Sequence, residues 1–163
     1  MASSDTEATT EALFYHLEQQ PLERILPGLV ERSLERGWRV VIEAGTPERV
    51  AALDTLLWTY RDDSFLAHGT AADGHAAEHP VFLTDGADNP NGAAIRFLVD
   101  GASASPQDWA NRLRTYKRVV LIFDGNDADA ITRARGQWKS AKEAGCAISY
   151  WQQSREGRWE RKA

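Results

Sequence analysis

The sequence lacks the features that mark secreted and membrane proteins. Its single cysteine, Cys146, allows no disulfide within the chain, and its place at the apolar start of an expected strand predicts a buried, inert thiol. No apolar run approaches the roughly 20 residues of a membrane span. Residues 1–10 carry neither a basic side chain nor an apolar run, so they do not resemble a signal peptide. The sequence therefore predicts a cytoplasmic protein without a membrane partner.

The chain has no excess of positive charge, because its 19 Lys and Arg against 24 Asp and Glu give a formal net charge of -5 at pH 7. Affinity for phosphate backbones comes from many contacts with Lys and Arg, so an acidic chain is a poor general binder of nucleic acid. A local basic patch can still bind an anionic partner. The distribution of the basic residues therefore matters more than their total.

A glycine-rich phosphate loop is missing as well. Such a loop lets backbone amides approach a pyrophosphate. Residues 18–21, after the first expected strand, contain no glycine and one acid, and residues 43–47, after the second, contain one glycine. No segment matches a phosphate loop of the Gly-Lys-Ser/Thr type. We therefore expect no nucleotide cofactor.

Signals for catalysis are weak. His68, His75 and His79 lie in a polar loop rich in Ala and Gly, so we expect solvated histidines and no metal. Asp124 and Asp127 follow an apolar strand, where ligands of open α/β sheets often bind. We favour capping of the next helix as the role of these two carboxylates. The alternative that stays open is an enzyme that uses both of them with a nucleotide or a divalent metal.

The sequence does contain an alternation of strand and helix patterns. The expected strands are 13–17, 38–42, 81–84, 95–99, 119–123 and 147–151, and residues 157–160 are expected to return as a hairpin. The expected helices are 21–36, 47–57, a short one that begins at Pro106, and 127–144. Such alternation predicts an α/β fold: a three-layer sandwich with a mostly parallel central sheet and helices on both faces.

The chain is long enough for one compact domain, and it shows no internal repeat and no interior linker. Residues 1–10 are rich in Ser, Thr and Ala, which predicts a disordered extension. We therefore expect a single α/β domain over residues 11–163.

The last expected helix carries the most informative surface pattern. Arg135, Trp138, Lys139 and Lys142 stand at positions i, i+3, i+4 and i+7, which share one helix face. One interpretation is a solvated basic face near a helix C-terminus. Another is a docking site for a short peptide that bears a carboxylate and an aromatic ring. Single-stranded DNA offers a third, through stacking and positive charge, although the patch is small for it.

A second aromatic pair lies near the middle of the chain. Trp58 and Phe65 flank the polar segment 59–63, which follows the second expected helix. These rings belong either to the core or to an apolar patch for a partner protein.

Taken in order, several segments resemble the chi subunit family of bacterial DNA polymerase III. The resemblance runs over about residues 13–151, and its matching segments are 14–17, 37–42, 53–58, 64–69, 80–84, 89–92, 120–124 and 134–139. Each is weakly specific by itself, and their order and spacing carry the resemblance.

The resemblance implies a non-catalytic clamp-loader subunit with a nucleotide-binding-like fold and no cofactor. One surface of this family binds the acidic C-terminal tail of single-stranded-DNA-binding protein, which implies an indirect contact with single-stranded DNA. Arg135, Trp138 and Lys139 match the tail-binding positions, Lys142 extends their stripe, and Phe123 borders the pocket by its position.

The resemblance also implies a second protein partner, either the psi subunit or a helicase. Trp58 and Phe65 match the aromatic positions of that second surface.

Overall fold

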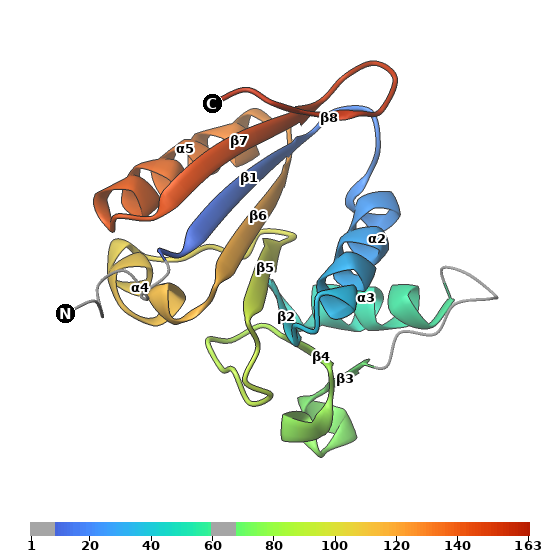
Figure 1. The fold of residues 1–163 in the computed structure, drawn as a ribbon. Helices are drawn as coiled ribbons and strands as arrows, with labels where there is room; N and C mark the ends of the chain where they lie inside the picture. Colours follow the sequence, from blue (N-terminus) through green and yellow to red (C-terminus); the bar gives the residue numbers. More distant parts are fainter. Residues whose placement is uncertain (1–8, 60–67) are drawn as a thin grey trace.

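The computed structural model describes residues 9–59 and 68–163, which form one eight-stranded sheet in the order β3-β4-β2-β5-β6-β1-β7-β8 (Figure 1). The strands are β1 (Glu11–Leu17), β2 (Val40–Ala44), β3 (His68–Thr70), β4 (Val81–Thr84), β5 (Ile95–Val99), β6 (Arg118–Asp124), β7 (Ala147–Gln153) and β8 (Trp159–Arg161). Neighbouring strands pair in parallel, except that β8 returns antiparallel to β7. The predicted C-terminal hairpin is thereby confirmed.

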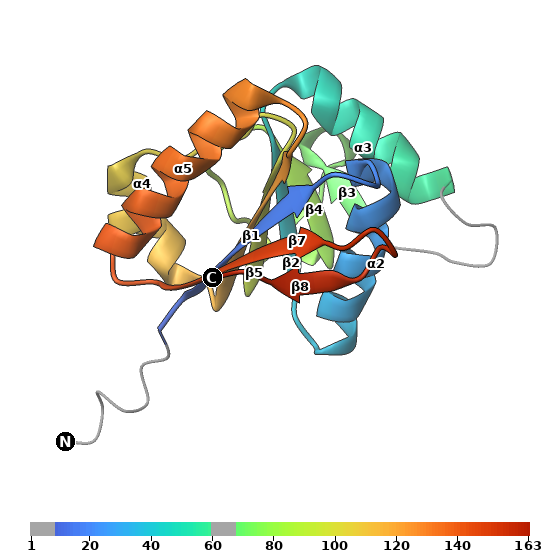
Figure 2. The same cartoon turned by 90° about the horizontal axis from the view of Figure 1, so that it is seen from above.

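Four α-helices form the outer layers of the described structure. They are α2 (Leu22–Glu35), α3 (Pro47–Thr59), α4 (Pro106–Ala110) and α5 (Ala128–Glu143). Apolar side chains of α2 and α3 pack into one hydrophobic cluster, and those of α4 and α5 pack into another on the opposite face (Figure 2). The predicted three-layer α/β sandwich is confirmed.

The central strands are buried along their whole length, as expected for parallel strands covered on both faces. Arg96 of β5 is a charged residue within these buried strands, and its guanidinium is fully buried. Its Nη2 donates to Glu43 Oε1 at 2.7 Å, and its Nη1 donates to Asp88 O and to the hydroxyl of Tyr116. A charge this deep is tolerated because every donor direction meets an acceptor.

The observed elements differ from the predicted ones at the second strand. It was expected at 38–42 but runs from Val40 to Ala44. Gly37 adopts a left-handed φ of 82° after α2. The guanidinium groups of Arg36 and Arg118 lie 5.1 and 5.3 Å from the centroid of the Trp38 ring. The Trp38 N–H donates to the backbone oxygen of Ser33 at 3.1 Å, so Trp38 belongs to the C-terminal cap of α2 and the strand begins after it.

Thr10 belongs to the folded domain and not to the predicted N-terminal extension. Thr10 was expected in the disordered extension, but it is buried, and its hydroxyl donates to the backbone oxygens of Arg114 and Tyr116 at 3.0 and 2.8 Å. Residues 1–8 lie outside the described part of the chain. Among the described residues, no helix has the length and apolar character needed to span a bilayer. The cytoplasmic location stays a prediction.

The chain leaves two neighbouring strands in opposite directions. After β1 it crosses to β2 through α2 on one face, and after β6 it crosses to β7 through α5 on the other. Because β1 and β6 are parallel neighbours, their carboxyl ends diverge here and leave a cleft, which is where open α/β sheets usually hold ligands.

Candidate functional site

Local sequence explains the position of α5. Asp127 caps the helix, because its Oδ1 accepts from the backbone N–H of Asp129 at 2.9 Å and of Ala130 at 3.3 Å. The buried face consists of Ala130, Ala134 and Ala141, whose small side chains let the helix lie close to β6, β1 and β7. The predicted capping role of Asp127 is therefore confirmed.

The predicted stripe lies on the side of α5 that faces β7. Arg135, Lys139 and Lys142 are exposed, and Trp138 is half-buried. The indole of Trp138 makes edge-to-face contacts with Phe14 of β1 at 5.3 Å and with Tyr150 of β7 at 6.0 Å between ring centroids. The three cations thus border an aromatic ring that is anchored in the core on one side and accessible on the other.

A row of rings lies beneath this stripe, across three adjacent strands. The ring of His16 on β1 lies 5.2 Å from Phe123 on β6 and 5.8 Å from Tyr150 on β7. His16 Nδ1 and the Tyr150 hydroxyl form a short hydrogen bond. Phe123 is buried, so it supports Tyr150 from below, at 6.2 Å between ring centroids, and offers little surface to a ligand.

Sequence reasoning missed Tyr150. The residue was expected only as part of the last strand, yet it is half-buried and contacts Trp138, Phe123 and His16. Its face follows from the strand period of two, because its neighbours Ser149 and Trp151 point to the α2 side. That signal becomes usable only when β7 is known to lie beside β1.

Electrostatics distinguish Tyr150 from the cations around it. Burial raises the pKa of Tyr150, Arg135 acts to lower it, and Glu18 acts to raise it. The hydroxyl is therefore neutral near pH 7, and the positive charge of the face comes from Arg135, Lys139 and Lys142.

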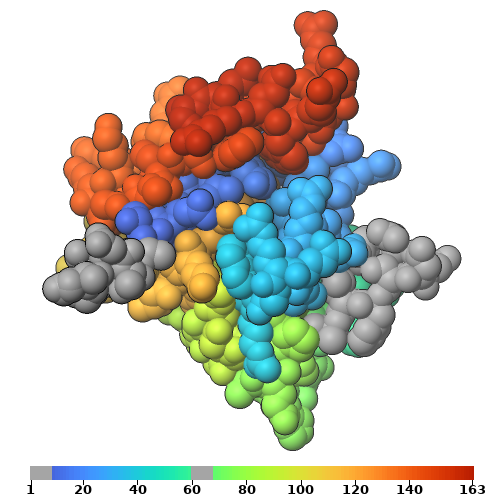
Figure 3. Space-filling model, in the orientation of Figure 1, coloured from blue at the N-terminus to red at the C-terminus, as the bar shows by residue number. Residues whose placement is uncertain are grey.

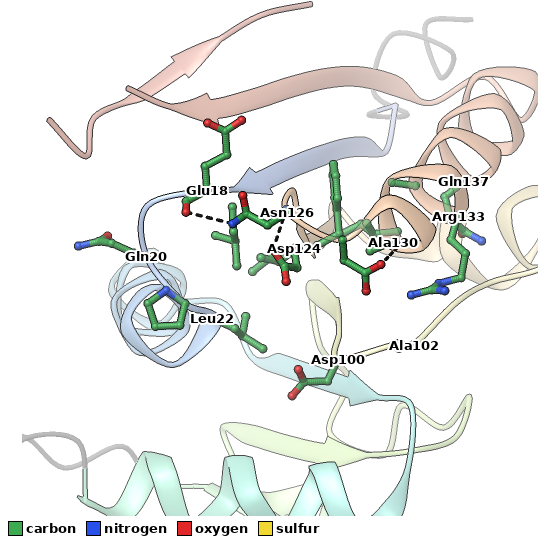
Figure 4. A pocket seen from close by; sticks show the side chains of 18 of the residues that line it. Glu18, Gln20, Leu22, Asp100, Ala102, Asp124, Asn126, Ala130, Arg133 and Gln137 are labelled. Carbon is green, nitrogen blue, oxygen red and sulfur yellow. Dashed lines mark hydrogen bonds between the residues drawn. The ribbon is translucent and has the colours of Figure 1, made fainter. Parts of the chain in front are cut away.

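The cleft at the carboxyl ends of β1 and β6 is lined mainly by acidic side chains, unlike the basic face of α5 (Figure 4). It has a volume of about 490 Å³, and its charged lining residues are Glu18, Glu23, Asp100, Asp124, Asp127 and Arg133. Arg49 pairs with Asp100 at 2.9 Å and lies 3.6 Å from Glu23, so the remaining negative charge comes from Glu18, Asp124 and Asp127. This net negative lining disfavours a nucleotide's phosphates. Asp124 Oδ1 accepts from the backbone N–H of Asn126 at 2.8 Å, which gives this carboxylate a structural role.

The histidine loop differs in part from expectation. His75 is exposed, as predicted, but His68 is buried, and its Nε2 lies 3.1 Å from both the backbone oxygen and Oδ1 of Asp54. The prediction of a solvated His68 is therefore wrong, because β3 forms there and takes the side chain into the protein. Within residues 9–59 and 68–163, no group of three or more His, Cys, Asp or Glu could hold a metal ion.

The second predicted surface is described only in part. Trp58 lies near the end of α3, is 51% exposed, and contacts the ring of His68 at 4.4 Å between centroids. Phe65 lies outside the described residues. The structure therefore places one of the two aromatic positions at the surface.

Comparison with known proteins identifies the family. A model of the family described as "DNA polymerase III chi subunit, HolC" matches residues 9–149. The chain belongs to this family. It is also similar to the probable DNA polymerase III subunit chi of Rickettsia prowazekii (strain Madrid E), with 28% identity over 116 residues that cover 68% of this chain and 67% of the relative.

The chi family match spans most of the sheet and α5, so the Arg135–Lys142 stripe lies inside it. It ends at residue 149, so Tyr150, Trp151 and β8 lie beyond the matched segment. The chain is thus a DNA polymerase III accessory subunit by family, and most of its C-terminal hairpin, from Tyr150 onward, lies outside the match.

Proposed function

We propose that this chi-family chain is a non-catalytic accessory subunit that binds the acidic C-terminal tail of single-stranded-DNA-binding protein, and so links the clamp-loader assembly to coated single-stranded DNA. The observation that carries the proposal is the α5 face. Arg135, Lys139 and Lys142 surround the half-buried Trp138 in a chain whose net charge is -5. Local positive charge beside a ring fits an acidic peptide with an aromatic end.

The proposed mode of binding uses both the cations and the ring of this face. A peptide carboxylate pairs with Arg135 or Lys139, since charge-assisted hydrogen bonds are the strongest that a surface offers. The peptide's ring packs against the accessible side of Trp138 and beside Tyr150, which are held rigidly by Phe14, Phe123 and His16. Because the pocket rings are already ordered, little entropy is lost when the peptide binds.

The second partner of the proposal is the psi subunit or a helicase. The exposed Trp58 supports a protein contact at the end of α3, because a single large exposed ring is the common anchor of such interfaces. Phe65 remains part of this hypothesis on the family resemblance alone.

The experiment is a fluorescence anisotropy titration with a labelled peptide that copies the tail. Arg135→Ala with Lys139→Ala should weaken binding about tenfold or more, because two charge-assisted contacts are lost. Trp138→Ala should weaken it by a similar factor through loss of the ring contact. The matched control is Arg133→Ala, which removes a cation from the cleft side of the same helix and should leave affinity unchanged.

Titrations with altered peptides test which groups of the tail are recognised. A peptide without its terminal aromatic residue, and one with an amidated C-terminus, should each bind more weakly than the full tail. Added salt should weaken the full tail, because the charges are exposed. Unchanged affinity in the Arg135/Lys139 variant, or an equal loss in Arg133→Ala, would reject this site.

A further inference from the structure

The side of the sheet opposite α5 carries a second, larger cluster of cations and rings. Helix α2 packs on β2 and β6, so β1, β7 and β8 extend beyond it on this face. Figure 3 shows β1 at the bottom of a furrow between α2 and the β7–β8 hairpin. We call this the α2 furrow, and its side chains are Tyr15, Arg32, Arg36, Trp38, Arg118, Trp151, Trp159 and Arg161.

Three arginines converge on a small pocket at one end of the furrow. The pocket has a volume of about 110 Å³, and Arg32, Arg36 and Arg118 line it together with Tyr15. Trp38 holds the guanidinium groups of Arg36 and Arg118, and Glu11 accepts two hydrogen bonds from Arg118, the shorter at 2.8 Å. Glu11 offsets one of the three charges, so the pocket keeps a positive excess from two exposed arginines.

Aromatic rings continue the furrow beyond the pocket. Tyr15 and Trp159 stack at 4.7 Å between centroids with an angle of 26° between their planes, and Trp151 meets Tyr15 edge-on at 6.3 Å. All three rings are half-buried. Arg161 lies opposite Trp151 in the β7–β8 register and adds a further exposed cation.

We propose that the α2 furrow binds single-stranded DNA directly, with a phosphate held by Arg32, Arg36 and Arg118 and a neighbouring base stacked on Trp159. The planar guanidinium group matches phosphate oxygens, and bases stack on aromatic rings regardless of sequence. A pocket of about 110 Å³ accommodates a phosphate group. Several rings in a row favour a strand of bases over a peptide with one aromatic residue.

This site is independent of the tail-binding face, because the two lie on opposite sides of the sheet. Trp151, Trp159 and Arg161 also follow residue 149, where the chi family match ends, so the furrow uses residues outside that match. The family's place in DNA replication makes single-stranded DNA the occupant that the furrow would meet.

The test is an anisotropy titration of the full chain with a labelled oligothymidine of about 12 nucleotides, within the usual size of a single-fold site. Arg32→Ala with Arg36→Ala should weaken binding about tenfold or more at low salt. The slope of log affinity against log salt should become shallower by about 0.7, since one phosphate contact is lost and each contributes roughly 0.7 for a single strand. The matched control is Arg135→Ala with Lys139→Ala, which removes the same charge from the opposite face and should leave DNA affinity within about twofold.

The base-stacking half of the proposal has its own variant. Trp159→Ala should weaken oligothymidine binding severalfold, and Trp159→Phe should restore part of it. A duplex of the same length should bind more weakly than the single strand, because its bases are already stacked.

Two outcomes would overturn the assignment. One is equal DNA affinity in the Arg32/Arg36 variant and the unsubstituted protein, or an equal loss in the Arg135/Lys139 control. The other is a loss of affinity for the acidic tail peptide, with unchanged affinity for DNA, in the Arg32/Arg36 variant. That result would show that the furrow binds a peptide.

Discussion

The two long sides of α5 face surfaces of opposite charge. On the β7 side, Arg135, Lys139 and Lys142 surround the ring of Trp138. On the other side, Arg133 lines a cleft whose other charged groups, among the described residues, are five carboxylates. The cleft is where this fold class usually holds a phosphate, yet its charge disfavours one. The comparison shows that fold position alone does not locate the binding site.

The two sides are also built differently. The cleft is lined by the turns after β1, β5 and β6, where carboxylates cap and brace the backbone. The β7 side is lined by one exposed helix face over rings that are fixed in the core. A helix face over a rigid base keeps its side chains in register, which suits recognition of a short peptide.

The largest effect is expected at Gly125, which joins the two regions. A Cβ atom there would overlap the ring of His16 and lie 2.6 Å from the backbone oxygen of Leu17. Gly125→Ala should therefore lower the free energy of unfolding by about 2 kcal/mol, because either β1 or the turn must shift. It should also weaken tail binding, since His16 supports Tyr150. Urea unfolding and peptide anisotropy measure the two effects.

The control for Gly125 lies in α5, the helix that follows it. Gly136 has no atom within 4 Å of an added Cβ atom, and it is an interior position of α5. Gly136→Ala should raise the free energy of unfolding by roughly 0.5–1 kcal/mol through helix propensity. A similar loss of stability in both variants would contradict the steric explanation.

An intermediate effect is expected at Asp127. Its substitution tests whether the cleft side has a structural role or a binding role. Asp127→Ala removes the cap of α5 and should cost about 1 kcal/mol of stability. Tail affinity should remain within about twofold, because the Arg135 side is untouched. Thermal and urea unfolding beside peptide titration test both statements, and a loss of tail affinity without a loss of stability would give the cleft a direct part in binding.

The smallest effect is a pH dependence on the β7 side. Burial raises the pKa of Tyr150 above its ordinary value of 10.0, so the folded protein holds this proton more tightly than the unfolded chain. Stability is therefore complete below about pH 10 and falls as the pH rises through the folded pKa. Tyr150→Phe should make the loss of stability above about pH 10 shallower in urea unfolding. An unchanged slope would show that Tyr150 does not carry the effect.

Much of the architecture followed from local patterns. The apolar runs 81–84 and 95–99 coincide with β4 and β5, and the predicted helix 127–144 nearly coincides with α5. These elements were predictable because the repeat of apolar residues and the cap at Asp127 act over a few positions. The buried His68 was not predictable, because its contact with Asp54 forms only when β3 joins the sheet. The second strand was misplaced because the backbone cap of α2 includes Trp38.

The candidate site shows the same division. The helical spacing of Arg135, Trp138 and Lys139 was readable because a helix repeats every 3.6 residues. Tyr150 was not readable, because its contacts with Trp138 and Phe123 join three strands that are distant in sequence. The α2 furrow was likewise not readable, because it requires side chains of β1 and β8 to meet on the same face of one sheet.

By itself, the sequence determined the fold class, the family, and the alignment of one ring with three cations along a helix, since each depends on residue type and short-range spacing. Only the tertiary structure decided which rings support that helix, that the strand-end cleft is acidic, and that arginines of α2 and β6 share a furrow with tryptophans of the C-terminal hairpin. The physical reason is that these arrangements depend on strand order and on contacts between distant segments, which no local pattern encodes.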